Sequence, residues 1–208
     1  MYIPKFNAVT DQALLHDLMR QFSFATLVTT HDGVPYATHL PFLVYPDAGP
    51  QGTLVAHLAR ANGQWRDFAE EREALVIFQG AHAYISPSWY AERVSVPTWN
   101  YAVVHAYGVP RVIEDETRVL AVLQALVDQH EGGFEEPWPM DLPEEYLHRQ
   151  IKAIVAFELP ITRLEGKFKL SQNRSAEDQR RVVEALSSSA DASALAVGAM
   201  MRERLPAE

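Results

Sequence analysis

Hydrophobic and polar positions along the chain predict short helices and strands in succession. Leu14, Leu15, Leu18 and Met19 recur at helical spacing after Thr10, which predicts an N-terminal helix capped by that threonine. Because the same spacing leaves the intervening positions polar, one face of this helix is expected to pack against the rest of the protein.

Strands are predicted where β-branched and aromatic residues cluster or alternate with polar ones. Residues 24–30 form the first such run, and His31-Asp32-Gly33 predicts a hairpin turn into a return strand over 35–45. Further extended segments are expected at 53–58, 74–79, 83–85, 100–114 and 153–164. The hairpin connections favour an antiparallel arrangement of these strands.

Helices interrupt this series of strands. Helical spacing is expected at 60–71, 117–130 and 144–150, and in a helix capped by Ser175. Segment 100–114 is expected to be one long strand with a bulge or bend at Gly108 and Pro110. The pattern therefore favours an α+β protein built on an antiparallel barrel, and the absence of a GxGxxG loop disfavours a Rossmann site.

Composition narrows the class of protein. The chain has 208 residues, 48% hydrophobic and 22% charged, which fits one globular domain with a sizeable core. It has no cysteine, so disulfides, zinc–thiolate sites and iron–sulfur clusters are excluded. No signal peptide or membrane-spanning window is recognisable, so we expect a cytoplasmic protein without membrane association. The net charge of −9 disfavours binding to DNA phosphates over a general surface.

Candidate chemistry lies in four segments that mix aromatic, polar and turn residues. These segments are 38–42, 57–65, 84–90 with 97–101, and 166–174. Segment 57–65 leads from a strand into a helix N-terminus and carries Arg60, a combination that suits an anion. Together they offer what flavin mononucleotide (FMN) needs, although each alone also fits core aromatics or solvated charges. Histidines 39, 57, 82 and 105 show no HxH or HExxH spacing, so no metal site is expected.

Several motifs resemble those of the PaiB-like family, described as FMN-binding negative transcriptional regulators. The matching segments are Met1-Tyr2-Ile3-Pro4, His39-Leu40-Pro41-Phe42, His57-Leu58-Ala59-Arg60-Ala61-Asn62, residues 81–90, Val96-Pro97-Thr98-Trp99-Asn100-Tyr101, and residues 166–174. The resemblance implies an FMN-binding split-barrel domain over residues 1–186. Residues 187–208, rich in small side chains at the start, are expected to form a helical or flexible tail.

The resemblance also implies an antiparallel split β-barrel with flanking helices, related to pyridoxamine 5′-phosphate oxidase, and a homodimer with FMN in a groove at the interface. By position, the cofactor-binding residues are Thr38, His39, His57, Arg60, Asn62, Ser86, Trp89, Thr98, Trp99, Asn100 and Lys167. Arg60, with His57 and Asn62, is expected at the phosphate, and no catalytic residue is assigned. Gly63 stands where the family pattern suggests proline, so the adjoining turn is expected to be looser and FMN affinity lower.

Three functions are compatible with the sequence. A negative transcriptional regulator or flavin-dependent sensor is favoured, with a flavin-dependent oxidoreductase as the alternative. A haem-binding protein is the third, with His39, His57, His105 or His148 as ligand. No helix-turn-helix is recognisable, so direct DNA contact would rely on the basic cluster of Lys167, Lys169, Arg174, Arg180 and Arg181, which Glu165, Glu177 and Asp178 partly offset.

Overall fold

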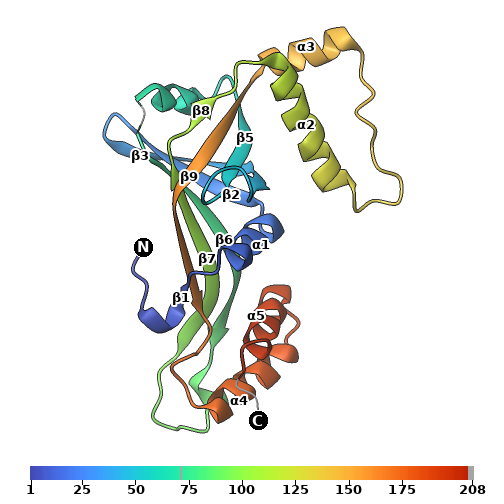
Figure 1. The fold of residues 1–208 in the computed structure, drawn as a ribbon. Helices are drawn as coiled ribbons and strands as arrows, with labels where there is room; N and C mark the ends of the chain where they lie inside the picture. Colours follow the sequence, from blue (N-terminus) through green and yellow to red (C-terminus); the bar gives the residue numbers. More distant parts are fainter. Residues whose placement is uncertain (71, 206–208) are drawn as a thin grey trace. The chain divides into compact units, whose positions relative to one another are not determined.

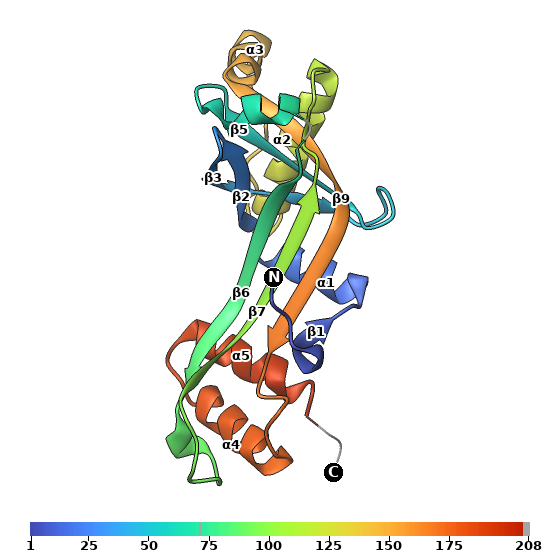
Figure 2. The same ribbon diagram turned by 90° about the vertical axis from the view of Figure 1, so that its left-hand side faces the viewer.

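The computed structural model describes residues 1–70 and 72–205. The chain divides into two compact units. Unit 1 is formed by Met1–Asp11, Gln79–Val104 and the chain from Glu165 onward, and unit 2 by Gln12–Phe78 and His105–Leu164. Three long strands contribute residues to both units: β6 (Ala74–Ile85), β7 (Thr98–Gly108) and β9 (Ile154–Lys169) (Figure 2).

Unit 2 holds most of the remaining strands. Its elements are α1 (Gln12–Gln21), β2 (Phe24–His31), β3 (Val34–Pro41), β4 (Leu43–Tyr45), β5 (Thr53–Ala59), the 3-10 helix η2 (Gly63–Glu70), β8 (Arg111–Val112), α2 (Glu116–Glu131) and α3 (Glu144–Lys152) (Figure 1). The strand order is β3-β2-β6-β7-β9-β5-β4, and β8 pairs with β9. These elements confirm the α+β class and the antiparallel strand pairing predicted from the sequence.

The β2–β3 hairpin forms as predicted. Asp32 and Gly33 have φ angles of 49° and 78°, the left-handed values that a two-residue hairpin turn requires at both central positions. Pairing extends from His31 opposite Val34 to Phe24 opposite Pro41. Glycine at the second central position accommodates this conformation without the steric cost of a side chain.

The predicted return strand over 35–45 is in fact two strands. β3 ends at Pro41, and Leu43 of β4 pairs with Val55 of β5 instead of continuing beside β2. Phe42 lies at the junction, is fully buried, and contacts Phe78 with ring centroids 5.8 Å apart. The prediction was wrong because burial of Phe42 redirects the chain to a different strand partner.

The single strand predicted over 100–114 is also two. β7 ends at Gly108, where an added Cβ would lie 2.3 Å from the backbone oxygen of Pro160. Pro110 follows and supplies no amide hydrogen for a ladder, and β8 begins only at Arg111. The predicted bend is thus present, but it separates two strands instead of curving one.

Buried aromatic rings fix η2 against the strands of unit 2. Phe68 of η2 packs on Phe157 of β9 with centroids 5.0 Å apart, and Phe157 in turn contacts Phe42 at 6.1 Å. Phe68 is only 4% exposed. This anchoring sets the position of the loop that precedes η2, which carries Arg60 and Asn62.

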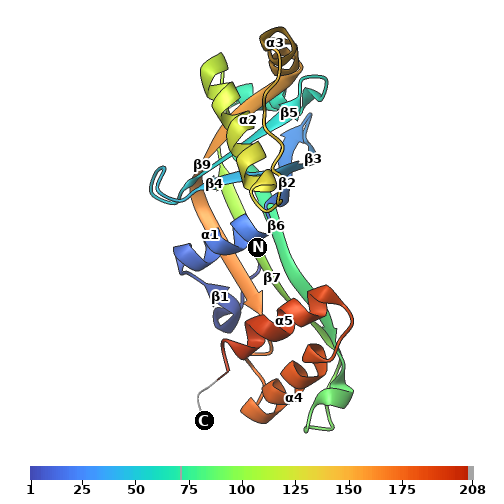
Figure 3. The ribbon, with the colours of Figure 1, turned by 90° about the vertical axis from the view of Figure 1, so that its right-hand side faces the viewer.

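Unit 1 consists of a strand layer with helices on one face. Besides its share of β6, β7 and β9, it contains η1 (Lys5–Asn7), β1 (Ala8–Val9), η3 (Pro87–Trp89), α4 (Ala176–Ser187) and α5 (Ala192–Arg202). Helices α4 and α5 pack together beside the ends of β6 and β7 (Figure 3). Ser175 caps α4 as predicted, since its Oγ accepts from the amide of Asp178 at 3.1 Å.

The segment expected to be helical or flexible after residue 187 contains α5. Its Ser193 Oγ accepts from the amide of His82 at 2.9 Å and donates to the His82 carbonyl at 2.8 Å. Val197 is fully buried. None of the helices in the part of the chain described here is both long and apolar enough to cross a membrane.

Candidate functional site

The predicted site residues fall into two groups, one in each unit. Thr38, His39, His57, Arg60 and Asn62 belong to unit 2. Ser86, Trp89, Thr98, Trp99, Asn100 and Lys167 belong to unit 1.

In unit 2, Arg60 lies directly after β5 and is held by the start of β9. Its amide donates to the Ala153 carbonyl, Nε donates to the Lys152 carbonyl and Nη2 to the Ile154 carbonyl, each at 2.8 Å. The remaining guanidinium nitrogen, Nη1, is available to an anion because Arg60 is exposed. The indole of Trp65 donates back to the Arg60 carbonyl at 3.1 Å.

Asn62 joins this loop to β3. Its Nδ2 donates to Thr38 Oγ1 at 3.0 Å, and its Oδ1 accepts from the amide of Gln64 at 3.1 Å at the beginning of η2. Thr38 thereby keeps its own hydroxyl hydrogen available as a donor. We call Arg60, Asn62 and Thr38 the Arg60 corner.

The two predicted histidines of unit 2 differ in environment. His57 Nδ1 is buried with no hydrogen-bond partner among the described residues. Burial lowers the pKa of His57 below its usual 6.5, so the ring is neutral at physiological pH. His39 is exposed and lies 6.4 Å from the ring of Phe24 in a stacked arrangement.

In unit 1, the face of the strand layer opposite the helices carries aromatic and cationic side chains. Trp99 is 53% exposed, and its ring lies 6.0 Å from Tyr84 and 6.1 Å from His82. We call the residues of this surface the aromatic–lysine face: His82, Tyr84, Trp99, Tyr101, Lys167 and Lys169. Tyr84, Tyr101 and His82 were absent from the predicted site, although strand alternation with buried Ala83 and Ala102 could have revealed them.

Two lysines border the aromatic rings of this face. Lys169 Nζ donates to Thr98 Oγ1 and, at 2.6 Å, to the Trp99 carbonyl. Lys167 Nζ lies 5.4 Å from the ring centroid of Tyr101 and 5.6 Å from that of Tyr2. Burial, followed by repulsion from Lys167 and Arg174, lowers the pKa of Lys169 below its usual value.

Asn100 points into unit 1, away from Trp99. It is fully buried, its Nδ2 donates to Ser171 Oγ at 2.9 Å, and the sulfur of Met201 lies 3.3 Å from the same nitrogen. Consecutive strand residues face opposite sides, so Trp99 and Asn100 do not present their side chains to one surface. Asn100 therefore contributes to the interior that supports Trp99.

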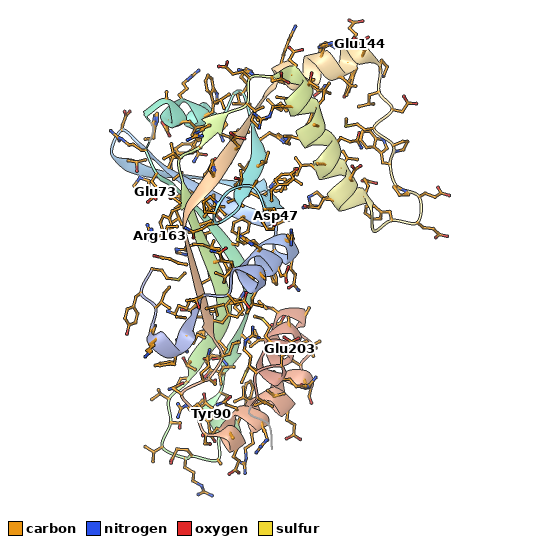
Figure 4. All side chains as sticks on the ribbon, in the orientation of Figure 1. Asp47, Glu73, Tyr90, Glu144, Arg163 and Glu203 are labelled. Carbon is orange, nitrogen blue, oxygen red and sulfur yellow. The ribbon has the colours of Figure 1, made fainter. Side chains whose placement is uncertain are left out.

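Ser86 and Trp89 flank the short helix η3. Ser86 Oγ accepts from the Ser88 amide at 3.2 Å and caps η3, and Trp89 is half-buried. Tyr90, which is labelled in Figure 4, follows η3. The guanidinium carbon of Arg174 lies 4.3 Å from the ring centroid of Tyr90. These contacts fix the loop between β6 and β7.

Each group, within its own unit, offers donors or surfaces of a kind that FMN binds. The Arg60 corner offers a guanidinium and a hydroxyl, and His57 of the same unit has a buried ring nitrogen without a partner among the described residues; these groups suit a phosphate and a ribityl chain. The aromatic–lysine face offers exposed rings with cations beside them, which suits a flat heterocycle with a polar edge. When bound, FMN would supply the electron-transfer chemistry.

A metal centre is not favoured by the same residues. Among residues 1–70 and 72–205, no group of three His, Asp or Glu side chains could hold a metal ion. Of the histidines considered for haem, His148 pairs with Glu116 and Glu144 at 3.5 and 3.6 Å. His57 and His105 are half-buried.

Fold and donor set together define a flavin-binding split-barrel protein. Comparison with known proteins identifies the family: residues 1–163 match the sequence model of a family described as "Putative FMN-binding domain". The chain belongs to this family, and its cofactor is FMN.

Relatives in sequence extend over nearly the whole chain. The protein is 37% identical over 206 residues to the protease synthase and sporulation protein PAI 2 of Bacillus subtilis, covering 99% of this chain and 98% of that protein. It is 28% identical to an uncharacterised protein of Emericella nidulans, over 98% of this chain and 97% of that one. The first match confirms the PaiB-like resemblance read from the motifs.

Solved structures show the same fold at low sequence identity. A FAD and heme binding protein from Mycobacterium smegmatis aligns with a TM-score of 0.62 at 20% identity, covering 83% of this chain and 78% of that chain. A flavocytochrome from Azotobacter vinelandii aligns with a TM-score of 0.62 at 18% identity, covering 80% and 72%. The predicted split-barrel fold is confirmed.

Proposed function

We propose that this protein is a flavin-dependent sensor of the PaiB type, in which the occupancy or redox state of bound FMN controls its regulatory effect. The observation that carries the proposal is the aromatic–lysine face: an exposed tryptophan between two other rings, with Lys169 bonded to its backbone. An exposed aromatic surface bordered by Lys167 favours a flat anionic ligand.

The first test is a visible absorbance spectrum of the purified full chain, followed by FMN and riboflavin titrations read by flavin fluorescence. Trp99→Leu is expected to lower the affinity for both flavins at least about fivefold, because FMN and riboflavin contain the same flavin ring. Trp138→Leu is the matched control, since Trp138 is 46% exposed but lies outside both groups of site residues. Equal effects of the two substitutions would remove Trp99 from the site, and a Soret band would favour haem over FMN.

Regulation through the flavin is preferred to direct DNA contact because the basic cluster is largely engaged within the protein. Arg174 stacks on Tyr90 and donates to Ser95 Oγ at 3.2 Å, and Arg181 pairs with Glu177 at 2.9 Å. Lys169 is turned to its own backbone neighbours. Side chains held in this way offer few free cations for phosphates.

Fluorescence anisotropy with a random-sequence DNA duplex at low salt tests this part of the proposal. We expect no saturable binding by the wild-type chain, and the same result after reduction of its flavin. Salt-dependent binding that disappears in Lys167→Ala/Lys169→Ala would overturn the preference and establish direct DNA contact.

The proposal includes a homodimer. Apolar side chains in unit 1 support a partner surface, since Val94 and Val96 are 90% and 70% exposed. Light scattering of the FMN-loaded protein is expected to give twice the chain mass. A monomer that retains FMN would overturn the interface arrangement implied by the family resemblance.

A further inference from the structure

A cavity of about 440 Å³ lies in unit 2 between η2 and the bend that joins β7 to β8. Its volume is within the range of small-molecule sites, about 300–1,000 Å³. Arg60, Asn62 and Thr38 do not line it. It is therefore a candidate site separate from the Arg60 corner.

Both walls of the cavity are fixed by the packing of unit 2. On one side, Phe68 inserts into the core against Phe157 and holds η2 in place. On the other, Gly108 lets the chain pass close to Pro160, and Pro110 ends the ladder before β8 begins. Both walls are therefore held by the same strand, β9.

The lining combines two cations with an apolar interior. Arg66 comes from η2 and Arg111 from β8, and no acidic residue is among the described residues that line the cavity. This is unexpected in a chain of net charge −9. The guanidinium carbon of Arg66 lies 5.5 Å from the ring centroid of Trp65, which orients it. Phe68, Pro110 and Val112 supply the apolar surface.

We propose that this cavity binds a small aromatic carboxylate as a ligand distinct from FMN. A guanidinium presents parallel N–H donors that match a carboxylate, and the apolar walls with Trp65 accommodate an aromatic ring. A neutral ligand of the same shape would leave both cations without a partner. This inference concerns a different site from the proposed flavin function and does not depend on it.

Trp65 connects this cavity with the Arg60 corner, because its side chain contacts both. The same indole lines a neighbouring cavity of about 350 Å³ together with Arg60 and Lys152. Its Nε1 donates to the Arg60 carbonyl at 3.1 Å. A carboxylate that repositions Arg66 over the ring would therefore act on a side chain that also supports the Arg60 corner.

The test uses isothermal titration calorimetry of the full chain with indole-3-acetate and its neutral analogue indole-3-acetamide. We expect saturable binding of the acetate and at least about tenfold weaker binding of the acetamide. Equal affinities for the two ligands, or no saturable binding of the acetate at millimolar concentration, would overturn the proposal. The comparison needs no substitution, so it holds even if a variant fails to fold.

Variants then locate the binding. Arg66→Gln and Arg111→Gln are each expected to remove most of the preference for acetate over acetamide. Arg20→Gln is the control, because Arg20 is an exposed arginine of unit 2 that does not line the cavity and whose Nη1 lies 3.5 Å from Asp17 Oδ1. Loss of preference in Arg20→Gln would show that the preference does not arise in this cavity.

Discussion

Replacing Arg60 with alanine separates two roles that the structure gives to one side chain. The guanidinium donates two hydrogen bonds of 2.8 Å to the carbonyls of Lys152 and Ile154. Their loss at this exposed position is expected to lower the free energy of unfolding by about 1–2 kcal/mol, after allowance for solvent screening. A contact from Nη1 to the FMN phosphate is worth about 1.5–3 kcal/mol, or about 10- to 150-fold in the dissociation constant.

Comparison of FMN with riboflavin isolates the phosphate contribution, since riboflavin lacks the phosphate. Urea unfolding of the flavin-free protein measures the structural role, and fluorescence titration with the two flavins measures the ligand role. We expect Arg60→Ala to lower both the midpoint in urea and the FMN-to-riboflavin affinity ratio. Arg60→Lys keeps the charge without the planar fork, so it should restore part of the ratio but little of the stability.

The structural role and the ligand role of Arg60 can be refuted separately. An unchanged FMN-to-riboflavin ratio with reduced stability would make Arg60 a purely structural clamp and move the phosphate elsewhere. An unchanged urea midpoint would mean that water replaces the two carbonyl contacts at no net cost.

Other substitutions test the surrounding structure. Asn100→Ala leaves Ser171 without its buried partner and should lower the free energy of unfolding by about 1–3 kcal/mol, measured by urea unfolding. Because burial lowers the pKa of His57 below 6.5, the unfolded chain gains a proton that the folded chain resists, so stability falls as pH drops through 6.5. His57→Gln should flatten that part of the pH–stability curve. Gly63→Pro, at the first position of η2, should raise stability by about 0.4–1 kcal/mol and tighten FMN binding; weaker FMN binding would contradict the assigned role of the turn.

Local patterns predicted those parts of the fold that depend on neighbouring residues. The α1 spacing, the Asp32-Gly33 turn and the Ser175 cap are all short-range features, and all three are present. The break after Pro41 was missed because residues 40–44 form an almost continuous apolar run. Nothing in that run tells which strand Leu43 will join, since its partner Val55 is chosen by packing across the sheet.

The site was predictable to the extent that motif position implies geometry. Asn62, in the loop after β5, and Thr38, in β3, were both predicted to bind the cofactor, and a hydrogen bond joins them. Trp99 and Asn100, both predicted to bind the cofactor, lie on opposite faces of β7, where strand alternation leaves one 53% and the other 0% exposed. The cavity beside Trp65 could not be predicted from the sequence, because its two walls, residues 65–69 and 109–112, are far apart along the chain.

The clamp on Arg60 also determines when the protein can acquire its cofactor. Its carbonyl acceptors lie 92 and 94 residues further along the chain. Contacts of such sequence separation form late in folding, after the local hairpins and helices. During synthesis the Arg60 corner therefore stays incomplete until residue 154 has left the ribosome. Nascent chains interrupted before that point would lack the carbonyl contacts of Arg60, so a complete Arg60 corner requires translation past residue 154 of the 208-residue chain.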